Sequence, residues 1–147
     1  MKIVKIIQWD MGHRVLHHRS ICKGLHGHRY KAEICVVGEV ISKADISEEG
    51  MVIDFADIKK ISKEFIQEKL DHAFMVWEKD EELIRFFNDS IGHKPVIVPF
   101  TPTAENVASY IFSELENKFQ DVYNTGLRLH SIKLWETPTS YALYQND

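Results

Sequence analysis

An alternation of side-chain character in residues 28–40, HRYKAEICVVGEV, is the feature that most constrains the fold of this chain. Tyr30, Ala32, Ile34 and Val36 alternate with Lys31, Glu33, Cys35 and Val37. Successive side chains of a β-strand point to opposite faces, so the pattern predicts a strand with one core-facing side.

The other segments place this strand in an α+β fold. We expect further strands at residues 2–10, 51–54, 126–136 and 140–145, an edge strand or loop at 94–100, and amphipathic helices from 55 to about 69 and from about 102 to 119. Asp54 is predicted to cap the first helix and Thr101 the second. Strands in hairpin-like pairs with grouped helices indicate an antiparallel sheet covered by helices on one face. The other face needs a cover, for which a second subunit is a candidate.

Composition excludes several classes of protein. The 147 residues suffice for one domain, residues 1–147, and the net charge of −4 offers no basic footprint for nucleic acid. No apolar run has the length of a membrane helix, and the N-terminus lacks the features of a signal peptide. Two cysteines do not form a disulfide framework, so we expect a cytoplasmic protein.

Histidine is the unusual residue, since five of the eight fall between His13 and His28. His26 and His28 are two apart on a strand and can converge on one ion, and His13 is the best candidate for a third ligand. The alternative is that His26 and His28 are two surface histidines. His17 and His18 are interpreted as solvated loop residues.

Four other residues are candidates for chemistry. Cys22 can act as a base or nucleophile if a metal or histidine lies nearby, or can be inert packing, as we expect of Cys35. Asp71 and His72 can form a proton relay. This signal is weak, because neighbours in sequence often cannot bond each other directly, and taken alone the two residues favour a helix-terminal histidine instead. Glu136 ends an apolar strand and needs a partner, which is either a ligand with paired N–H donors or a structural hydrogen bond.

Six motifs occur in an order that resembles one family. They are HR at His13, CKGLHGH, GMVIDF, LDH, PTAEN and WET, between about Trp9 and Tyr144. This order is similar to that of the 6-pyruvoyl- and 6-carboxy-tetrahydropterin synthases. The family often has Phe and Ala where this chain has Trp9 and Gly12.

The resemblance implies a fold and a site. The fold is the tunnelling fold (T-fold), a four-stranded antiparallel sheet with two helices on one face. Trimers of this fold close their sheets into a barrel, and two trimers stack into a hexamer with sites at subunit interfaces. The implied site comprises zinc ligands His13, His26 and His28, catalytic Cys22 with Asp71 and His72, pterin-anchoring Glu136, and Thr103 and Glu105 beside the pterin pocket.

The spacing C-x-x-x-H-G-H resembles the queuosine-pathway branch. That branch converts 7,8-dihydroneopterin triphosphate into 6-carboxytetrahydropterin, with release of acetaldehyde and triphosphate. The alternatives are a pyruvoyl-forming synthase of the biopterin type, a non-catalytic zinc-binding T-fold protein, and a zinc hydrolase that would need a water-activating carboxylate. A basic cluster is expected to hold the triphosphate, and it comprises Arg14, His17, His18, Arg19, Lys23 and Arg29.

Overall fold

The computed structural model describes residues 1–123 and 125–146. Its strands are β1 (Lys2–His13), β2 (His26–Val37), β3 (Ala73–Trp77), β4 (Pro95–Val98), β5 (Arg128–Thr137) and β6 (Ser140–Gln145). Its α-helices are α1 (Phe55–Phe65), α2 (Glu81–Asp89) and α3 (Ala104–Leu115), and α1 continues into a π-helical turn, η2 (Ile66–Leu70). The 3₁₀ turns η1 (Ile21–Lys23) and η3 (Glu116–Lys118) complete the described elements.

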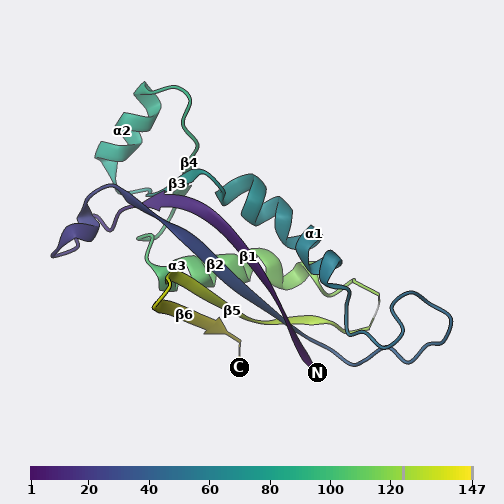
Figure 1. Cartoon of the computed structure of the whole chain (residues 1–147). Coiled ribbons are helices and arrows are strands. Elements are labelled where there is room, and N and C mark those ends of the chain that lie inside the picture. The colour runs from purple at the N-terminus through teal and green to yellow at the C-terminus, as the bar shows by residue number, and fades with distance from the viewer. Residues whose placement is uncertain (124, 147) are drawn as a thin grey trace.

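The strands form one curled, mixed sheet in the order β4-β3-β1-β2-β5-β6 (Figure 1). β1, β2, β5 and β6 are antiparallel neighbours, which confirms the predicted four-stranded antiparallel sheet and the α+β class. β3 is parallel to β1, and β4 is parallel to β3. These two strands and α2 form an extension of the sheet, residues 73–98, of which sequence analysis expected only an edge segment at β4.

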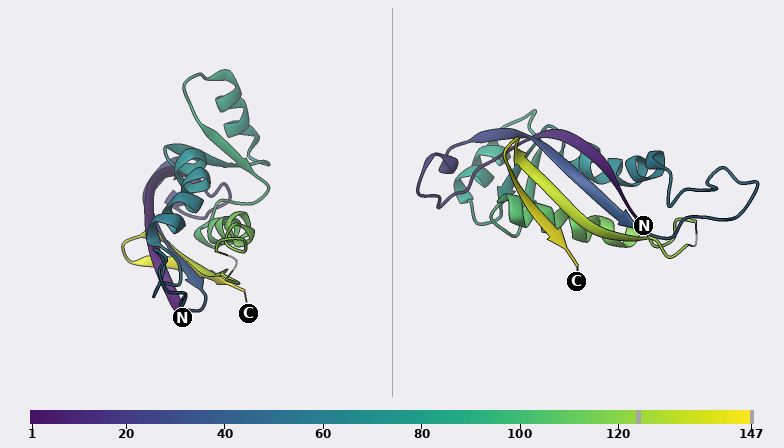
Figure 2. Two further views of the ribbon diagram at one scale, coloured as in Figure 1. Left: turned by 90° about the vertical axis from the view of Figure 1, so that its right-hand side faces the viewer. Right: turned by 60° about the horizontal axis from the view of Figure 1, so that its bottom comes forward.

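Helices α1 and α3 cover one face of the sheet (Figure 2). The residues that β2 buries on this face are the alternating Tyr30, Ala32, Ile34 and Val36, each fully buried. α3 packs Val107, Ala108, Ile111, Phe112 and Leu115 onto the same core. The opposite face is open and leaves apolar side chains of β1 and β6 exposed, namely Val4, Ile6, Tyr141 and Leu143.

Two local predictions were wrong. Residues 51–54 form a bend rather than a strand, although Val52 and Ile53 are buried against the core. Thr103, and not Thr101, caps α3, because its side chain accepts a hydrogen bond from the Asn106 amide. Asp54 caps α1 as predicted.

No helix in the part of the chain that the structure describes is long and apolar enough to cross a membrane.

Candidate active site and metal centre

Three histidines converge at the end of the β1–β2 ladder. His13 pairs with His26 and Met11 with His28, which places the three imidazoles on the helix-covered face of the sheet. Their nearest ring nitrogens all lie within 4.8 Å of one another. The prediction that His13, His26 and His28 come together is therefore confirmed, since the antiparallel register aligns the end of one strand with the start of the next.

Backbone carbonyls orient two of these rings. His13 Nδ1 donates to the carbonyl of Pro102 at 2.7 Å, and His26 Nδ1 donates to the carbonyl of Gly24 at 2.8 Å. The Nε2 atoms of His13 and His28 are buried and have no hydrogen-bond partner among the described residues. Unpartnered buried nitrogens are costly unless they bind something, and outer-shell hydrogen bonds of this kind are typical of metal-bound histidines. These residues fit a divalent metal ion such as zinc.

Burial also favours the protonation state that a metal needs. It lowers the pKa of His13 to about 4, with help from His26 and His28, although the Pro102 hydrogen bond acts in the other direction. Burial likewise lowers the pKa of His28, against the opposing charge of Glu136. Both imidazoles are therefore neutral near pH 7, as metal ligation requires.

Glu136 approaches the same nitrogens from β5. Its carboxylate oxygens lie 3.9 Å from His13 Nε2 and 3.8 Å from His28 Nε2, which is too long for hydrogen bonds. The register of β5 shifts between Trp135 and Thr137, at the point where Glu136 lies. The acid at the end of this strand thus reaches the histidine group, although it contributes no bond to it.

A cavity of about 280 Å³ joins several of the predicted site residues. Cys22, Thr103, Glu105 and Glu136 line it together with His13. Cys22 lies in η1 and is half-buried, and its carbonyl accepts a hydrogen bond from the Val15 amide. Cys35 is buried in β2, as expected for a packing residue. The thiol, the acids and one of the histidines thus face a common space.

Asp71 and His72 form a direct pair in a different place. His72 Nδ1 lies 3.0 Å from Asp71 Oδ1, and this carboxylate also accepts a hydrogen bond from the Asp10 amide. Burial alone would raise the pKa of Asp71, but the Asp10 and His72 contacts lower it overall, so the carboxylate is ionised. A direct bond between these neighbours had only a weak signal in the sequence; the left-handed conformation of His72, at φ 57°, accompanies the contact.

The two groups line different hollows of the chain. Cys22 lines the cavity beside His13, whereas His72 lines a second hollow with Asp10, Gly12 and Arg29. Gly12 has a packing role here, because a Cβ at this position would overlap the ring of Phe74 on β3. The added strand therefore accounts for a small residue before His13.

The predicted basic cluster was partly wrong. The side chain of Arg14 is 11% exposed and makes two hydrogen bonds of 2.6 Å to the buried Asp80 and one of 2.9 Å to Glu82. Arg29 pairs with Asp10 at 2.8 Å on the open face of the sheet. Strand alternation separates Arg29 from His28, and the extension supplies the acid for Arg14. His17, Arg19 and Lys23 remain exposed near Cys22.

Two further residues line the Cys22 cavity. His18, a member of the expected basic cluster that was interpreted as a solvated loop residue, lines it and accepts a hydrogen bond from the Ser20 amide. Tyr141, from β6, lines it as well. No pattern in the sequence marked Tyr141, because it reaches the cavity from an element distant along the chain.

The chain is similar to known proteins along nearly its whole length. The family model described as 6-pyruvoyl tetrahydropterin synthase matches residues 2–147. A 6-carboxy-5,6,7,8-tetrahydropterin synthase from Haemophilus influenzae is 38% identical over 146 residues, covering 98% of each chain.

Two solved structures are similar along the whole chain. An uncharacterized protein from Wolinella succinogenes has a TM-score of 0.80 at 25% identity, with 100% of this chain and 98% of the other covered. The 6-pyruvoyl tetrahydropterin synthase of Caenorhabditis elegans has a TM-score of 0.65 at 22% identity, with 100% and 96% covered. The second likeness concerns the fold alone. On the family model and the Haemophilus relative together, this chain belongs to the 6-pyruvoyl tetrahydropterin synthase family.

Proposed function

We propose that this protein is a zinc-dependent 6-carboxy-5,6,7,8-tetrahydropterin synthase. It would convert 7,8-dihydroneopterin triphosphate and water into 6-carboxytetrahydropterin, with release of acetaldehyde and triphosphate. The observation that carries the proposal is the convergence of His13, His26 and His28 beside a cavity that also holds Cys22 and Glu136. The carboxy branch is favoured by the C-x-x-x-H-G-H spacing and by the name of the Haemophilus relative.

His13, His26 and His28 would hold the zinc ion. When bound, zinc supplies Lewis-acid polarisation of the oxygens on the substrate side chain. The Nδ1 hydrogen bonds to Pro102 and Gly24 keep two of the Nε2 atoms turned away from those carbonyls, toward the shared centre. The lowered pKa values of His13 and His28 mean that these two imidazoles need no deprotonation near neutral pH, which favours ligation.

The other residues have roles in binding and proton transfer. Glu136 would accept hydrogen bonds from the paired N–H groups of the pterin ring, with Thr103 and Glu105 beside it. Cys22 Sγ, as the thiolate, would take a proton from the substrate side chain, and His72 would return or remove one. The ionised Asp71 holds His72 through Nδ1, which leaves Nε2 for the transfer. Expulsion of triphosphate, a good leaving group, follows the proton transfers. Addition of water and cleavage of a carbon–carbon bond of the side chain would then release acetaldehyde and leave the carboxylate on the pterin.

We also propose that the chain acts as a homo-hexamer, a dimer of trimers with shared active sites. Cys22 and His72 line different hollows of one chain, so a complete catalytic group needs His72 from a neighbour. The open face of the sheet exposes Val4, Ile6, Tyr141 and Leu143, which a closed barrel would cover. The small-molecule pterin triphosphate is then the substrate at each interface.

Product analysis tests the proposal. Purified protein loaded with zinc is incubated with 7,8-dihydroneopterin triphosphate, and the products are separated and identified by mass. We expect 6-carboxytetrahydropterin and stoichiometric acetaldehyde. A pyruvoyl product without acetaldehyde would assign the biopterin-type branch instead. Dihydroneopterin alone would assign a hydrolase with Glu136 as base, and unchanged substrate would indicate a non-catalytic metal protein.

A further inference from the structure

Lys94 lies immediately before β4 and contacts the turn that carries Asp71 and His72. Its ammonium donates to the carbonyl oxygen of Glu68 at 2.5 Å and to that of Asp71 at 3.0 Å. The Lys94 carbonyl in turn accepts from the Phe74 amide at 2.9 Å. One residue of the extension therefore binds the chain on both sides of His72.

The turn itself has an unusual geometry. α1 widens into the π-helical η2, and the Asp71 amide closes that turn by donating to the Ile66 carbonyl at 3.0 Å. π-helical turns of this kind occur frequently at functional sites. His72 follows with a φ of 57°, a left-handed conformation that is unfavourable for a non-glycine residue. A conformation of this kind persists only where surrounding contacts hold it.

Contacts from two strands hold the turn. The His72 amide donates to the Asp10 carbonyl at 2.8 Å, and the Asp10 amide donates to Asp71 Oδ1 at 3.1 Å, so β1 binds one side. Lys94 binds the carbonyls of the other side. Carbonyls at a helix C-terminus carry partial negative charge, and a lysine ammonium there is stabilising and has three N–H donors for them.

We propose that Lys94 is a positioning residue for the Asp71–His72 pair, and that this is the contribution of residues 73–98 to the reaction. The inference rests on the relay role proposed above for Asp71 and His72. Without the ammonium, the Asp71 carbonyl loses its partner, and the turn loses the contact that opposes relaxation of His72 from its left-handed conformation. The relay would then sample other orientations relative to the substrate.

Lys94→Met tests the proposal, because it keeps the length and apolar stem of the side chain and removes the charge. We expect kcat to fall about ten-fold, because small misplacement of a catalytic group is costly, with KM within about two-fold of wild type. Hydrogen exchange of the Asp71 and His72 amides, measured without substrate, should accelerate about ten-fold. Lys94→Arg, which keeps cationic N–H donors, should restore most of both.

Lys69→Met is the matched control. Lys69 belongs to the same turn, but its ammonium donates to the Tyr110 hydroxyl at 2.7 Å rather than to a backbone carbonyl. The Lys69→Met substitution removes a lysine hydrogen bond from η2. It should leave both kcat and the hydrogen exchange of the Asp71 and His72 amides unchanged.

Three results would overturn the proposal. They are unchanged exchange in Lys94→Met, an equal effect of Lys69→Met, and accelerated exchange with wild-type kcat. The exchange measurement needs no turnover. A wild-type protein that fails to form 6-carboxytetrahydropterin therefore refutes the proposed function, while the exchange of Lys94→Met still decides whether Lys94 holds the turn.

Discussion

The histidine group and the Asp71–His72 pair are built in opposite ways. Each brings three titratable side chains within 4.8 Å, the second with Asp10. The side chains of His13 and His28 are 2% and 20% exposed, whereas that of His72 is 79% exposed. The first group lies on the paired strands β1 and β2, whereas Asp71 and His72 of the second lie on a turn beside β1. The proposed metal site is thus complete within one chain, while the proposed relay faces outward.

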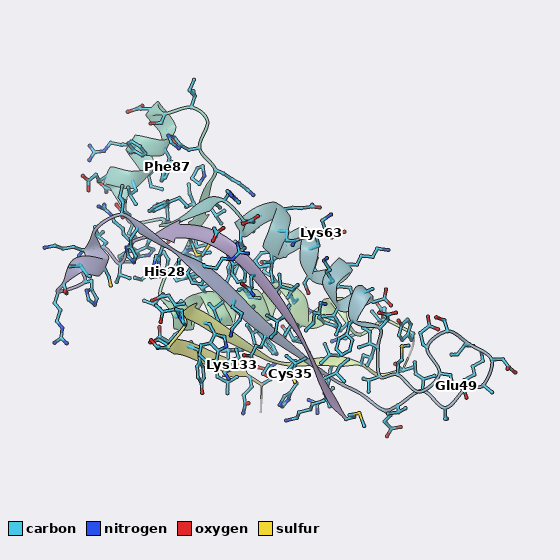
Figure 3. The ribbon with its side chains drawn as sticks, viewed as in Figure 1. His28, Cys35, Glu49, Lys63, Phe87 and Lys133 are labelled. Carbon is cyan, nitrogen blue, oxygen red and sulfur yellow. The ribbon has the colours of Figure 1, made fainter. Side chains whose placement is uncertain are left out.

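The two ends of the molecule also differ in the residues that they carry. His28 lies near one end of β2, and Glu49 lies in the long loop at the far end of the molecule (Figure 3). Phe87 on α2 projects beyond the histidine end, in the extension that holds both Arg14 and the Asp71–His72 turn (Figure 3). Candidate chemistry therefore gathers at the end of the sheet that the extension braces.

The largest expected effect comes from breaking the histidine group. His26→Ala and His28→Ala should each lower zinc affinity more than about 100-fold, because each removes a direct ligand. Metal analysis after gel filtration measures it, and activity should be lost with the zinc. His130→Ala is the control, since His130 contacts Lys2 at the other end of β1. Full zinc occupancy in both ligand variants would refute the metal centre.

The second prediction is that Cys22 and His72 of one active site come from different chains. Cys22→Ala and His72→Ala should each be nearly inactive alone. Mixed in equal amounts and reassembled, about a quarter of the interfaces would pair an intact Cys22 with an intact His72. Up to about a quarter of the wild-type rate should return. If native mass spectrometry confirms mixed oligomers and no rate returns, Cys22 and His72 act within one chain.

A third substitution tests the contact between Arg14, which follows β1, and Asp80 of the extension. Asp80 is 3% exposed, accepts two hydrogen bonds from Arg14 and caps α2. Asp80→Asn should lower the free energy of unfolding by about 3 kcal/mol, because Arg14 loses a buried partner. Glu82→Gln, which removes the 76% exposed partner, should cost below about 1 kcal/mol. Equal losses in urea titrations would contradict the assignment.

The Arg14–Asp80 pair also predicts how the free energy of unfolding depends on pH under acid conditions. Burial alone would raise the pKa of Asp80, but the hydrogen bonds from Arg14 and the Leu83 amide lower it overall from 3.8. The native state therefore binds fewer protons than the unfolded state near this pH. The stabilisation by Asp80 is fully present above pH 3.8 and is lost as the pH falls through the lower native value. In Asp80→Asn, this part of the decrease in the free energy of unfolding at low pH should be absent.

The two cysteines provide a milder test of the cavity. Cys22 is half-buried in a cavity, and Cys35 is 7% exposed inside β2. Iodoacetamide at neutral pH should modify Cys22 at least about ten-fold faster, since reaction requires access to the sulfur. Peptide mass spectrometry measures both sites. Equal or reversed rates would place the reactive thiol elsewhere.

The smallest effect is expected from the remaining basic residues. Arg19→Glu with Lys23→Glu should raise KM for the triphosphate substrate roughly three- to ten-fold by weakening local attraction of the anion. Lys59→Glu with Lys63→Glu on α1 is the control, because it changes the net charge equally and Lys63 lies away from His28 (Figure 3). An unchanged KM in the first variant would assign Arg19 and Lys23 to a solvated surface.

Much of the fold was predictable because its signals are local. The alternation from Tyr30 to Val36 marked the buried face of β2, and the spacing of apolar residues marked α1 and α3. The residues 140–145 matched β6. The expected edge segment at 94–100 matched β4. The rest of the extension was missed because β3 is short, and its parallel pairing joins segments that no local pattern relates.

The candidate site was likewise predictable where its signals are local and not where it depends on distant contacts. The sequence by itself determined the meeting of His13, His26 and His28, because a hairpin register and the two-residue strand period follow from chain order. The same strand period turns Arg29 away from His28. Only the tertiary structure decided that Arg14 is bound by Asp80 and that Tyr141 reaches the Cys22 cavity. Those outcomes depend on which distant segment packs nearby, and contacts at long sequence separation leave no periodic trace in the chain.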